Sequence, residues 1–187
     1  MRELVYYVAV SLDGFIAAPD GAFDAFPVEG DHMNYILSEY ADAIPTDIAA
    51  QLGVQQQRTR FGTVLMGADT YAAGLPMMPS PYRHLEQIVF THRGVEAPDV
   101  TALDADPVEV VRDLKTQDGA DIWLCGGGRL AGALRGEIDR LVLKRNPVAF
   151  GAGIPLFDRV SYDPVPFERI GALDFESGVS VVEYVRG

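Results

Sequence analysis

Short apolar runs alternate with segments of helical periodicity along most of the chain. Strands are predicted over residues 4–10, 63–66, 88–91 and 122–125, and from residue 141 onward. Helices are predicted over residues 31–43, 46–57 and 107–116, after Gly67, and after the glycines at 126–128. This alternation is typical of a mostly parallel sheet with helices on both faces. Two further runs, 167–175 and 179–185, predict a C-terminal antiparallel hairpin that makes the sheet mixed.

Pro45 separates the first two predicted helices. In the first, over residues 31–43, apolar side chains recur on one face, which is expected to pack on the sheet. In the second, which Thr46 can cap, Ile48 and Leu52 are expected to point inward.

The segment from Asp121 to Arg135 joins a buried strand, three glycines and an apolar-periodic helix. This order places free backbone N–H groups and the positive end of a helix at the carboxyl edge of the sheet, which suits a phosphate or pyrophosphate. Glycine allows backbone and ligand to approach closely. A tight turn without any ligand fits the same glycines.

The glycines also match, formally, the dinucleotide fingerprint Gly126-x-Gly128-x-x-Ala131. The match lies late in the chain, and no acidic residue follows at the expected distance. Lys144 and Arg145 lie nearer that distance, and they either bind a 2′-phosphate or form a solvated strand end.

Four loops follow predicted parallel strands and should therefore meet at one edge of the sheet. They comprise residues 11–17, 67–70, 91–93 and 126–129. Ligands of open α/β sheets bind beyond the carboxyl ends of the strands, so this edge is the expected binding crevice.

Two carboxylates near this edge have alternative interpretations. Asp13 either holds a turn by bonding nearby backbone or contacts the substrate. Asp31, with Glu29, either caps the following helix or has a pKa raised by burial and serves as proton source or substrate anchor.

Composition excludes several classes. The 187 residues are enough for one compact domain, and a net charge of −12 argues against a nucleic-acid partner. No apolar run approaches the roughly 20 residues that span a bilayer. A single cysteine, Cys125, excludes an intramolecular disulfide and favours the cytoplasm; it is expected in the core rather than as a nucleophile. The three histidines lack metal-ligand spacing, so no metal is predicted.

Taken in order, these motifs resemble the dihydrofolate reductase-like family, which includes the reductase domain of bacterial riboflavin biosynthesis. The resemblance rests on the run Ser-Leu-Asp-Gly-Phe-Ile-Ala at 11–17 and on residues 64–71, 122–130, 139–141 onward and 147–157. It implies a three-layer α/β/α sandwich formed by residues 1–187, NADPH as the hydride donor, a small heterocyclic substrate and a homodimer.

By position, the resemblance implies roles for individual residues. The cofactor-binding residues would be Gly67, Ala68, Thr70, Thr91, His92, Arg93, Gly126, Gly127, Gly128, Arg129 and Leu130, and Asp13 and Asp31 would face the substrate as the catalytic pair. The chain departs from the family at Ala68, where an Arg is common, and at Cys125 and Tyr7, where the riboflavin enzymes have Glu and Lys. A substrate other than the ribosylaminopyrimidine is therefore expected, and a catalytically silent nucleotide-binding protein is the alternative function.

Overall fold

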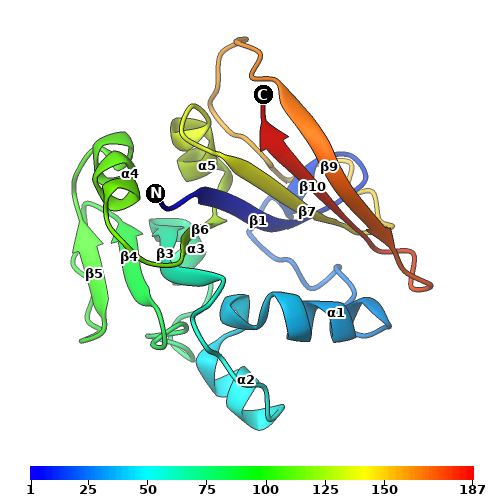
Figure 1. Cartoon of the computed structure of the whole chain (residues 1–187), viewed down its shortest axis with the longest axis horizontal. Helices are drawn as coiled ribbons and strands as arrows, with labels where there is room; N and C mark the ends of the chain where they lie inside the picture. The colour runs from blue at the N-terminus through cyan, green and yellow to red at the C-terminus, as the bar shows by residue number, and fades with distance from the viewer.

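The fold is built on a mixed eight-stranded sheet. A computed structural model describes residues 1–187 (Figure 1). Its strands are β1 (Leu4–Val10), β3 (Phe61–Gly67), β4 (Glu86–Phe90), β5 (Val100–Leu103), β6 (Asp121–Gly126), β7 (Arg140–Arg145), β9 (Phe167–Asp174) and β10 (Ser180–Arg186). The strand order is β5-β4-β3-β6-β1-β7-β10-β9. In this spatial order, all the strands from β5 through to β7 are parallel, and β10 pairs antiparallel with both β7 and β9. The predicted mixed sheet and its terminal hairpin are confirmed.

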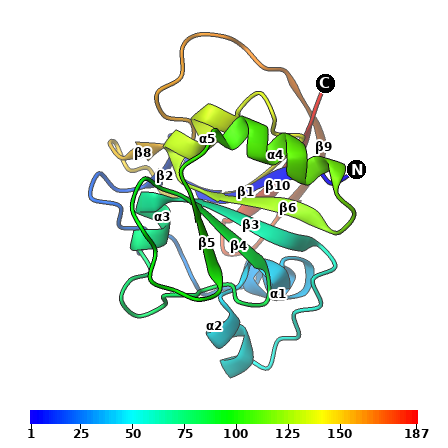
Figure 2. The same ribbon diagram turned by 90° about the vertical axis from the view of Figure 1, so that its left-hand side faces the viewer.

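Helices cover both faces of the sheet, which makes the predicted three layers. The helices are α1 (His32–Glu39), the 3₁₀ helix η1 (Ala41–Ala43), α2 (Thr46–Gln51), α3 (Ala68–Ala72), α4 (Pro107–Thr116) and α5 (Gly128–Leu134). Figure 2 shows α4 and α5 on one side of the sheet and α1 and α2 on the other. A second, two-stranded sheet pairs β2 (Phe15–Ala17) with β8 (Ile154–Pro155).

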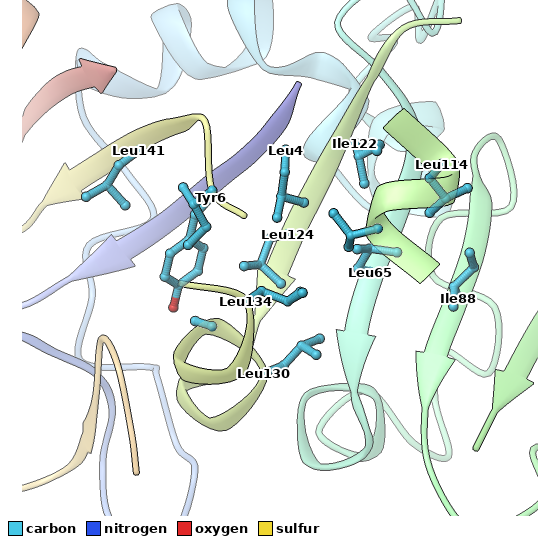
Figure 3. Close-up of a cluster of buried hydrophobic side chains, with 13 residues drawn as sticks. Leu4, Tyr6, Leu65, Ile88, Leu114, Ile122, Leu124, Leu130, Leu134 and Leu141 are labelled. Carbon is cyan, nitrogen blue, oxygen red and sulfur yellow. The ribbon is translucent and has the colours of Figure 1, made fainter. Parts of the chain in front are cut away.

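Each face of the sheet has its own hydrophobic core. The first lies under α4 and α5, whose Leu114, Leu130 and Leu134 pack on the leucines and isoleucines of the central strands (Figure 3). The second lies under α1, where Ile36 and Tyr40 pack on Val64, Trp123 and other strand residues. The apolar face predicted for the first helix is therefore confirmed, and burial on both faces explains the nearly continuous apolar strands.

Helix α2 differs from the expectation. Ile48 and Leu52 are 40% and 56% exposed, and the buried residue of the helix is Ala49. Thr46 does not cap the helix, because its hydroxyl bonds His84 Nδ1 at 2.8 Å. Asp47, in the first turn of the helix, forms an ion pair with Arg83. Polar contacts with residues 81–84 thus fix the orientation of α2, and they outweigh the preference of its apolar side chains for the interior.

Candidate functional site

The loops that follow β3 and β6 meet at the carboxyl edge of the sheet, as predicted. A Cβ built on Gly67 would lie 3.6 Å from the Gly127 backbone nitrogen, because the two strands are neighbours. The Thr70 hydroxyl faces the same turn, 3.0 Å from a Cβ built on Gly127 and 3.7 Å from one built on Gly126. Gly126 has a φ of +136°, which a residue with a side chain rarely adopts, and the Gly126–Gly127 peptide bond is cis. These contacts form a narrow cradle of backbone and hydroxyl, here called the glycine cradle (Gly67, Thr70, Gly126 and Gly127).

Two of the predicted cofactor residues also have packing roles. A Cβ on Gly128 would lie 2.3 Å from the Pro155 carbonyl oxygen, so this glycine lets α5 approach β8. The Leu130 side chain is 7% exposed and points into the core under α5 (Figure 3). Only the backbone N–H groups of these residues, in the first turn of α5, are available to a ligand.

The positive groups predicted near this edge are exposed. Arg93 lies in the turn that follows β4. Its backbone N–H donates to the Thr91 hydroxyl at 3.0 Å. His92 Nδ1 lies 2.6 Å from Asp104 Oδ1. Arg129 stands between two carboxylates, 3.7 Å from Asp69 and 3.6 Å from Asp158, and its side chain is 61% exposed. Ala68 is the first residue of α3 and directly follows Gly67 of the cradle.

Lys144 and Arg145 lie away from the glycine cradle. They end β7, which is separated from β6 by β1. Lys144 is half-buried on the α1 face of the sheet, and Arg145 is exposed. The structure therefore does not support the interpretation of this pair as a 2′-phosphate site beside the glycines.

Asp13 lies in the loop that follows β1 and joins it to the loop that holds Phe150 and Gly151. Its carboxylate accepts hydrogen bonds from the Ser11 hydroxyl at 2.6 Å and from the backbone N–H groups of Phe150 and Gly151 at 3.0 and 2.7 Å. The Ser11 hydroxyl, then the N–H groups of Gly151 and Phe150, hold the pKa of Asp13 at about 2. Asp13 is therefore ionised at neutral pH. Its backbone partners lie in a distant loop, so it links two loops and does not hold the local turn that was one of the two roles predicted for it. Substrate contact, the other role, stays a prediction.

Asp13 should make the stability of the fold depend on pH at the acid end. Its pKa is about 2 in the fold against an ordinary value of 3.8, so its contribution is present above about pH 4 and is lost as the pH falls toward 2. We expect the unfolding temperature of Asp13→Asn to be lower than wild type at pH 5 and to converge with it at pH 2, as measured by circular dichroism from roughly pH 5 to 2. Asp20→Asn, in the next loop, is the control. If the unfolding temperatures of wild type and Asp13→Asn differ by the same amount at every pH, the ionised Asp13 does not stabilise the fold in this way.

Asp31 neither caps α1 nor has a raised pKa. Its side chain makes no capping bond, and instead it accepts the backbone N–H groups of Glu176 and Ser177 at 2.7 and 3.1 Å. Desolvation raises the pKa of Asp31, but these bonds outweigh it and leave the pKa below its ordinary value. Asp31 is thus a poor proton donor, and it ties the start of α1 to the β9–β10 turn.

The two positions that depart from the riboflavin enzymes, Tyr7 and Cys125, lie on the α1 face of neighbouring strands. Tyr7 stacks on Tyr40 with ring centroids 4.2 Å apart. Burial raises the pKa of the Cys125 thiol to about 12, with an opposing contribution from the hydroxyl of Tyr82. The thiol is therefore not activated, which agrees with the predicted core role for Cys125.

Sequence reasoning missed two buried polar residues, His32 at the start of α1 and Asn146 just after β7. His32 and Asn146 are both 0% exposed, and each has one side-chain atom without a hydrogen-bond partner. No sequence signal marks them, because a histidine at a helix start and an asparagine before a proline are ordinary residues in those places.

A surface hollow of about 440 Å³ lies at the opposite, amino edge of the sheet. Its lining includes Glu39, Arg60, Asp121 and Arg140. Arg140 is paired with Glu3 at 2.9 Å, and Arg60 lies over the Tyr40 ring at 4.3 Å. The hollow is open and its arginines are already engaged, so the carboxyl edge remains the candidate site. No helix of the structure is both long and apolar enough to span a bilayer.

Comparison with known proteins shows which family this sequence matches. The model of the RibD C-terminal domain family matches residues 2–180. The uncharacterized protein YwjB of Bacillus subtilis is 32% identical over 168 residues, 86% of this chain and 85% of YwjB. The uncharacterized YyaP of the same organism is 26% identical over 198 residues, 98% of this chain and 94% of YyaP.

Among solved structures, the fold is similar to that of a diaminohydroxyphosphoribosylaminopyrimidine deaminase/5-amino-6-(5-phosphoribosylamino)uracil reductase from Thermotoga maritima. The TM-score is 0.70 at 17% identity, over all of this chain and 57% of that one. This likeness supports the dihydrofolate reductase-like fold, while the match over nearly the whole chain identifies the family. The chain belongs to the RibD C-terminal domain family.

Proposed function

We propose that this chain is an NADPH-dependent reductase that transfers hydride to a small heterocyclic substrate, of the 5-amino-6-(5-phosphoribosylamino)uracil reductase or dihydrofolate reductase type. The observation that carries the proposal is the glycine cradle, where the Thr70 hydroxyl meets Gly126 and Gly127 at the carboxyl edge. The family supports reductase chemistry in general. The substrate and the cofactor are our inference for this chain.

The residues present fit a dinucleotide cofactor. A Cβ at Gly127 would fill the space beside the Thr70 hydroxyl, so the glycine keeps that space open for a phosphate oxygen. Backbone N–H groups and a hydroxyl can both donate to phosphate. The exposed Arg93 places positive charge at the same edge, against a net charge of −12 for the chain, whereas Arg129 lies between Asp69 and Asp158.

In this proposal the bound NADPH supplies the hydride, and the chain supplies position and environment. The glycine cradle holds the phosphates, while the bonds from Asp13 to residues 150 and 151 fix the loop that follows β1. Neither Asp13 nor Asp31 is suited to donate a proton, because both have lowered pKa values. We therefore assign both to positioning, and a bound water to the proton transfer.

Calorimetric titration of the purified protein with NADPH, NADP⁺ and NADH tests the cofactor. We expect dissociation constants of about 1–10 μM for NADPH and NADP⁺, and binding of NADH weaker by about tenfold or more. The difference would come from the 2′-phosphate, for which the exposed Arg93 guanidinium is the proposed partner. Absence of binding by all three at millimolar concentration would refute the proposal.

A catalytically silent nucleotide-binding protein is the second candidate. The observation that favours it is the engagement of both candidate carboxylates by backbone N–H groups. It predicts NADPH binding with no loss of NADPH absorbance when dihydrofolate or aminopyrimidines are added. Turnover of any of these compounds would exclude it.

The proposal also includes a homodimer in the cytoplasm. The outer strand β9 leaves a long sheet edge on which Ile170 and Leu173 are 50% and 45% exposed, and a second copy could cover it. The cytoplasm is proposed because the one cysteine, Cys125, has no disulfide partner.

A further inference from the structure

The ammonium group of Lys144 has no partner in the chain. It makes no ion pair and no hydrogen bond with another residue, whereas Lys115, the other lysine of the sequence, pairs with Asp139 at 2.6 Å. Lys144 is only half-buried and its Nζ is not enclosed, so the ammonium borders solvent. Burial lowers the pKa of Lys144, and no carboxylate opposes this effect. A partly desolvated charge without a counter-ion is unfavourable, so this lysine is suited to an anion from outside the chain.

The carboxylates on the same side of the sheet are engaged elsewhere. Glu183 of β10 accepts the Tyr40 hydroxyl at 2.6 Å, and its other oxygen lies 3.8 Å from Arg140. Asp31, just before α1, accepts two backbone N–H groups of the β9–β10 turn. Neither carboxylate contributes to the pKa of Lys144. The chain itself therefore does not supply the missing anion.

His32 also faces this part of the sheet, but it cannot neutralise the ammonium group. Burial, and then the charge of Lys144, lower the pKa of His32, so the two side chains are near each other. A hydrogen bond to the Pro27 backbone and the charge of Asp31 oppose these effects. The resulting pKa of His32 lies below its ordinary value of 6.5, so the imidazole is uncharged at neutral pH.

The side chains beside Lys144 are apolar or aromatic. Its cross-strand partners are Ala9 and Val181, and Val181 belongs to the core under α1, so Lys144 lies on this face of the sheet. Tyr7, two residues before Ala9 on β1, packs against the same core and is partly exposed. Phe175, at the end of β9, does the same. A flat aromatic ring would therefore find apolar contacts next to the ammonium group.

Lys144 is two strands away from the glycine cradle. Strand β1 lies between β6, which carries Gly126, and β7, which carries Lys144 (Figure 1). Neighbouring strands are about 4.8 Å apart, so the two positions are separated by roughly 10 Å. Ala9, the β1 residue beside Lys144, has only a methyl group as its side chain. A small molecule held by Lys144 would therefore lie next to a cofactor held at the cradle.

We propose that Lys144 binds the carboxylate of a small aromatic or heteroaromatic acid, which lies over Ala9 beside the glycine cradle. The ammonium group donates to a carboxylate oxygen, and the ring packs near Tyr7 and Val181. This inference rests on the proposed function, since it names the class of substrate that the reductase takes. It also gives Lys144 a role that the adjacent, exposed Arg145 does not share.

Calorimetric titration with benzoate and benzamide at neutral pH tests the inference, on the cofactor-free protein and on protein saturated with NADP⁺. The two probes share the ring, and only benzoate is charged. We expect benzoate to bind, and benzamide, which lacks the charge, to bind at least about tenfold more weakly. Lys144→Met should weaken benzoate binding about tenfold or more and leave benzamide binding unchanged. Arg145→Met removes a charge from the adjacent exposed position and should change neither.

Three calorimetric outcomes would overturn the inference: no benzoate binding in either form, equal binding of the two probes, or equal effects of the two substitutions. The net charge of −12 opposes benzoate elsewhere on the surface, so a preference for the anion is a specific result. NADP⁺ binding is measured in the same samples, so failure of the cofactor proposal is seen separately.

A second readout, NMR of the lysines after reductive ¹³C-methylation, needs no substitution in the binding site. The chain has two lysines, so the spectrum contains few signals, and Lys115, which is paired with Asp139, is an internal reference. Benzoate should shift the signal of Lys144 and leave that of Lys115 in place. Benzoate binding that leaves the Lys144 signal unmoved would place the acid elsewhere and contradict the inference.

Discussion

Gly128→Ala should lower the free energy of unfolding by about 2–3 kcal/mol, the cost of forcing extra volume into a packed interior. The new Cβ would lie 2.3 Å from the Pro155 carbonyl oxygen and 3.3 Å from two further side-chain atoms, of Asp158 and Ile154. A backbone oxygen cannot rotate away as a side chain can, so α5 or β8 would have to shift. Urea unfolding followed by circular dichroism measures the change as a lower midpoint.

Gly136→Ala is the matched control, since a Cβ there meets nothing within 4 Å and the φ is not positive. It should change the midpoint little or raise it, because alanine restricts the unfolded chain. Gly132→Ala should behave like Gly128→Ala, because its Cβ would lie 2.2 Å from the Asp158 carbonyl oxygen. Equal midpoints for Gly128→Ala and Gly136→Ala would show that α5 does not need the close approach.

The parts of the fold that local signals determine were predictable. Helix α4 begins and ends where the sequence indicates, because Pro107 sits at its first turn and Asp106 accepts the Val108 N–H at 2.8 Å. The glycine cradle was located correctly because parallel strands end at the same edge of the sheet. Strand β5 was not predicted, since it is four residues long at the sheet edge, two of its residues are exposed, and it carries little pattern.

The chemistry of the carboxylates was not predictable from the sequence. Asp13 and Asp31 lie near the expected edge. The Ser11 hydroxyl, a local partner, lowers the pKa of Asp13 most, and N–H groups from residues 150–151 lower it further. Desolvation raises the pKa of Asp31, but N–H groups from residues 176–177 outweigh it. These N–H groups are more than 130 positions away in the chain, so no spacing argument includes them. The unpaired atoms of His32 and Asn146 escape sequence reasoning for the same reason, because whether a buried atom has a partner depends on the whole fold around it.

Gly127→Ala should weaken NADPH binding by about tenfold to a hundredfold while it leaves the fold nearly as stable as wild type. Its Cβ would lie 3.0 Å from the Thr70 hydroxyl, so it would occupy the cradle and push away a hydrogen-bond donor to the phosphate. Loss of one hydrogen bond to a charged group costs about 1.5–3 kcal/mol, which gives this range. Calorimetric titration with NADPH measures the affinity, and Thr70→Val should reproduce most of the loss.

The comparison of Gly127→Ala with Gly128→Ala separates two uses of neighbouring glycines. At Gly127 the added methyl meets a side-chain hydroxyl that can rotate, whereas at Gly128 it meets a backbone carbonyl. The first substitution should therefore act on ligand affinity and the second on stability, with Gly136→Ala neutral in both measurements. If Gly127→Ala binds NADPH as tightly as wild type, the cradle does not hold the phosphates, and the cofactor must lie elsewhere along the carboxyl edge.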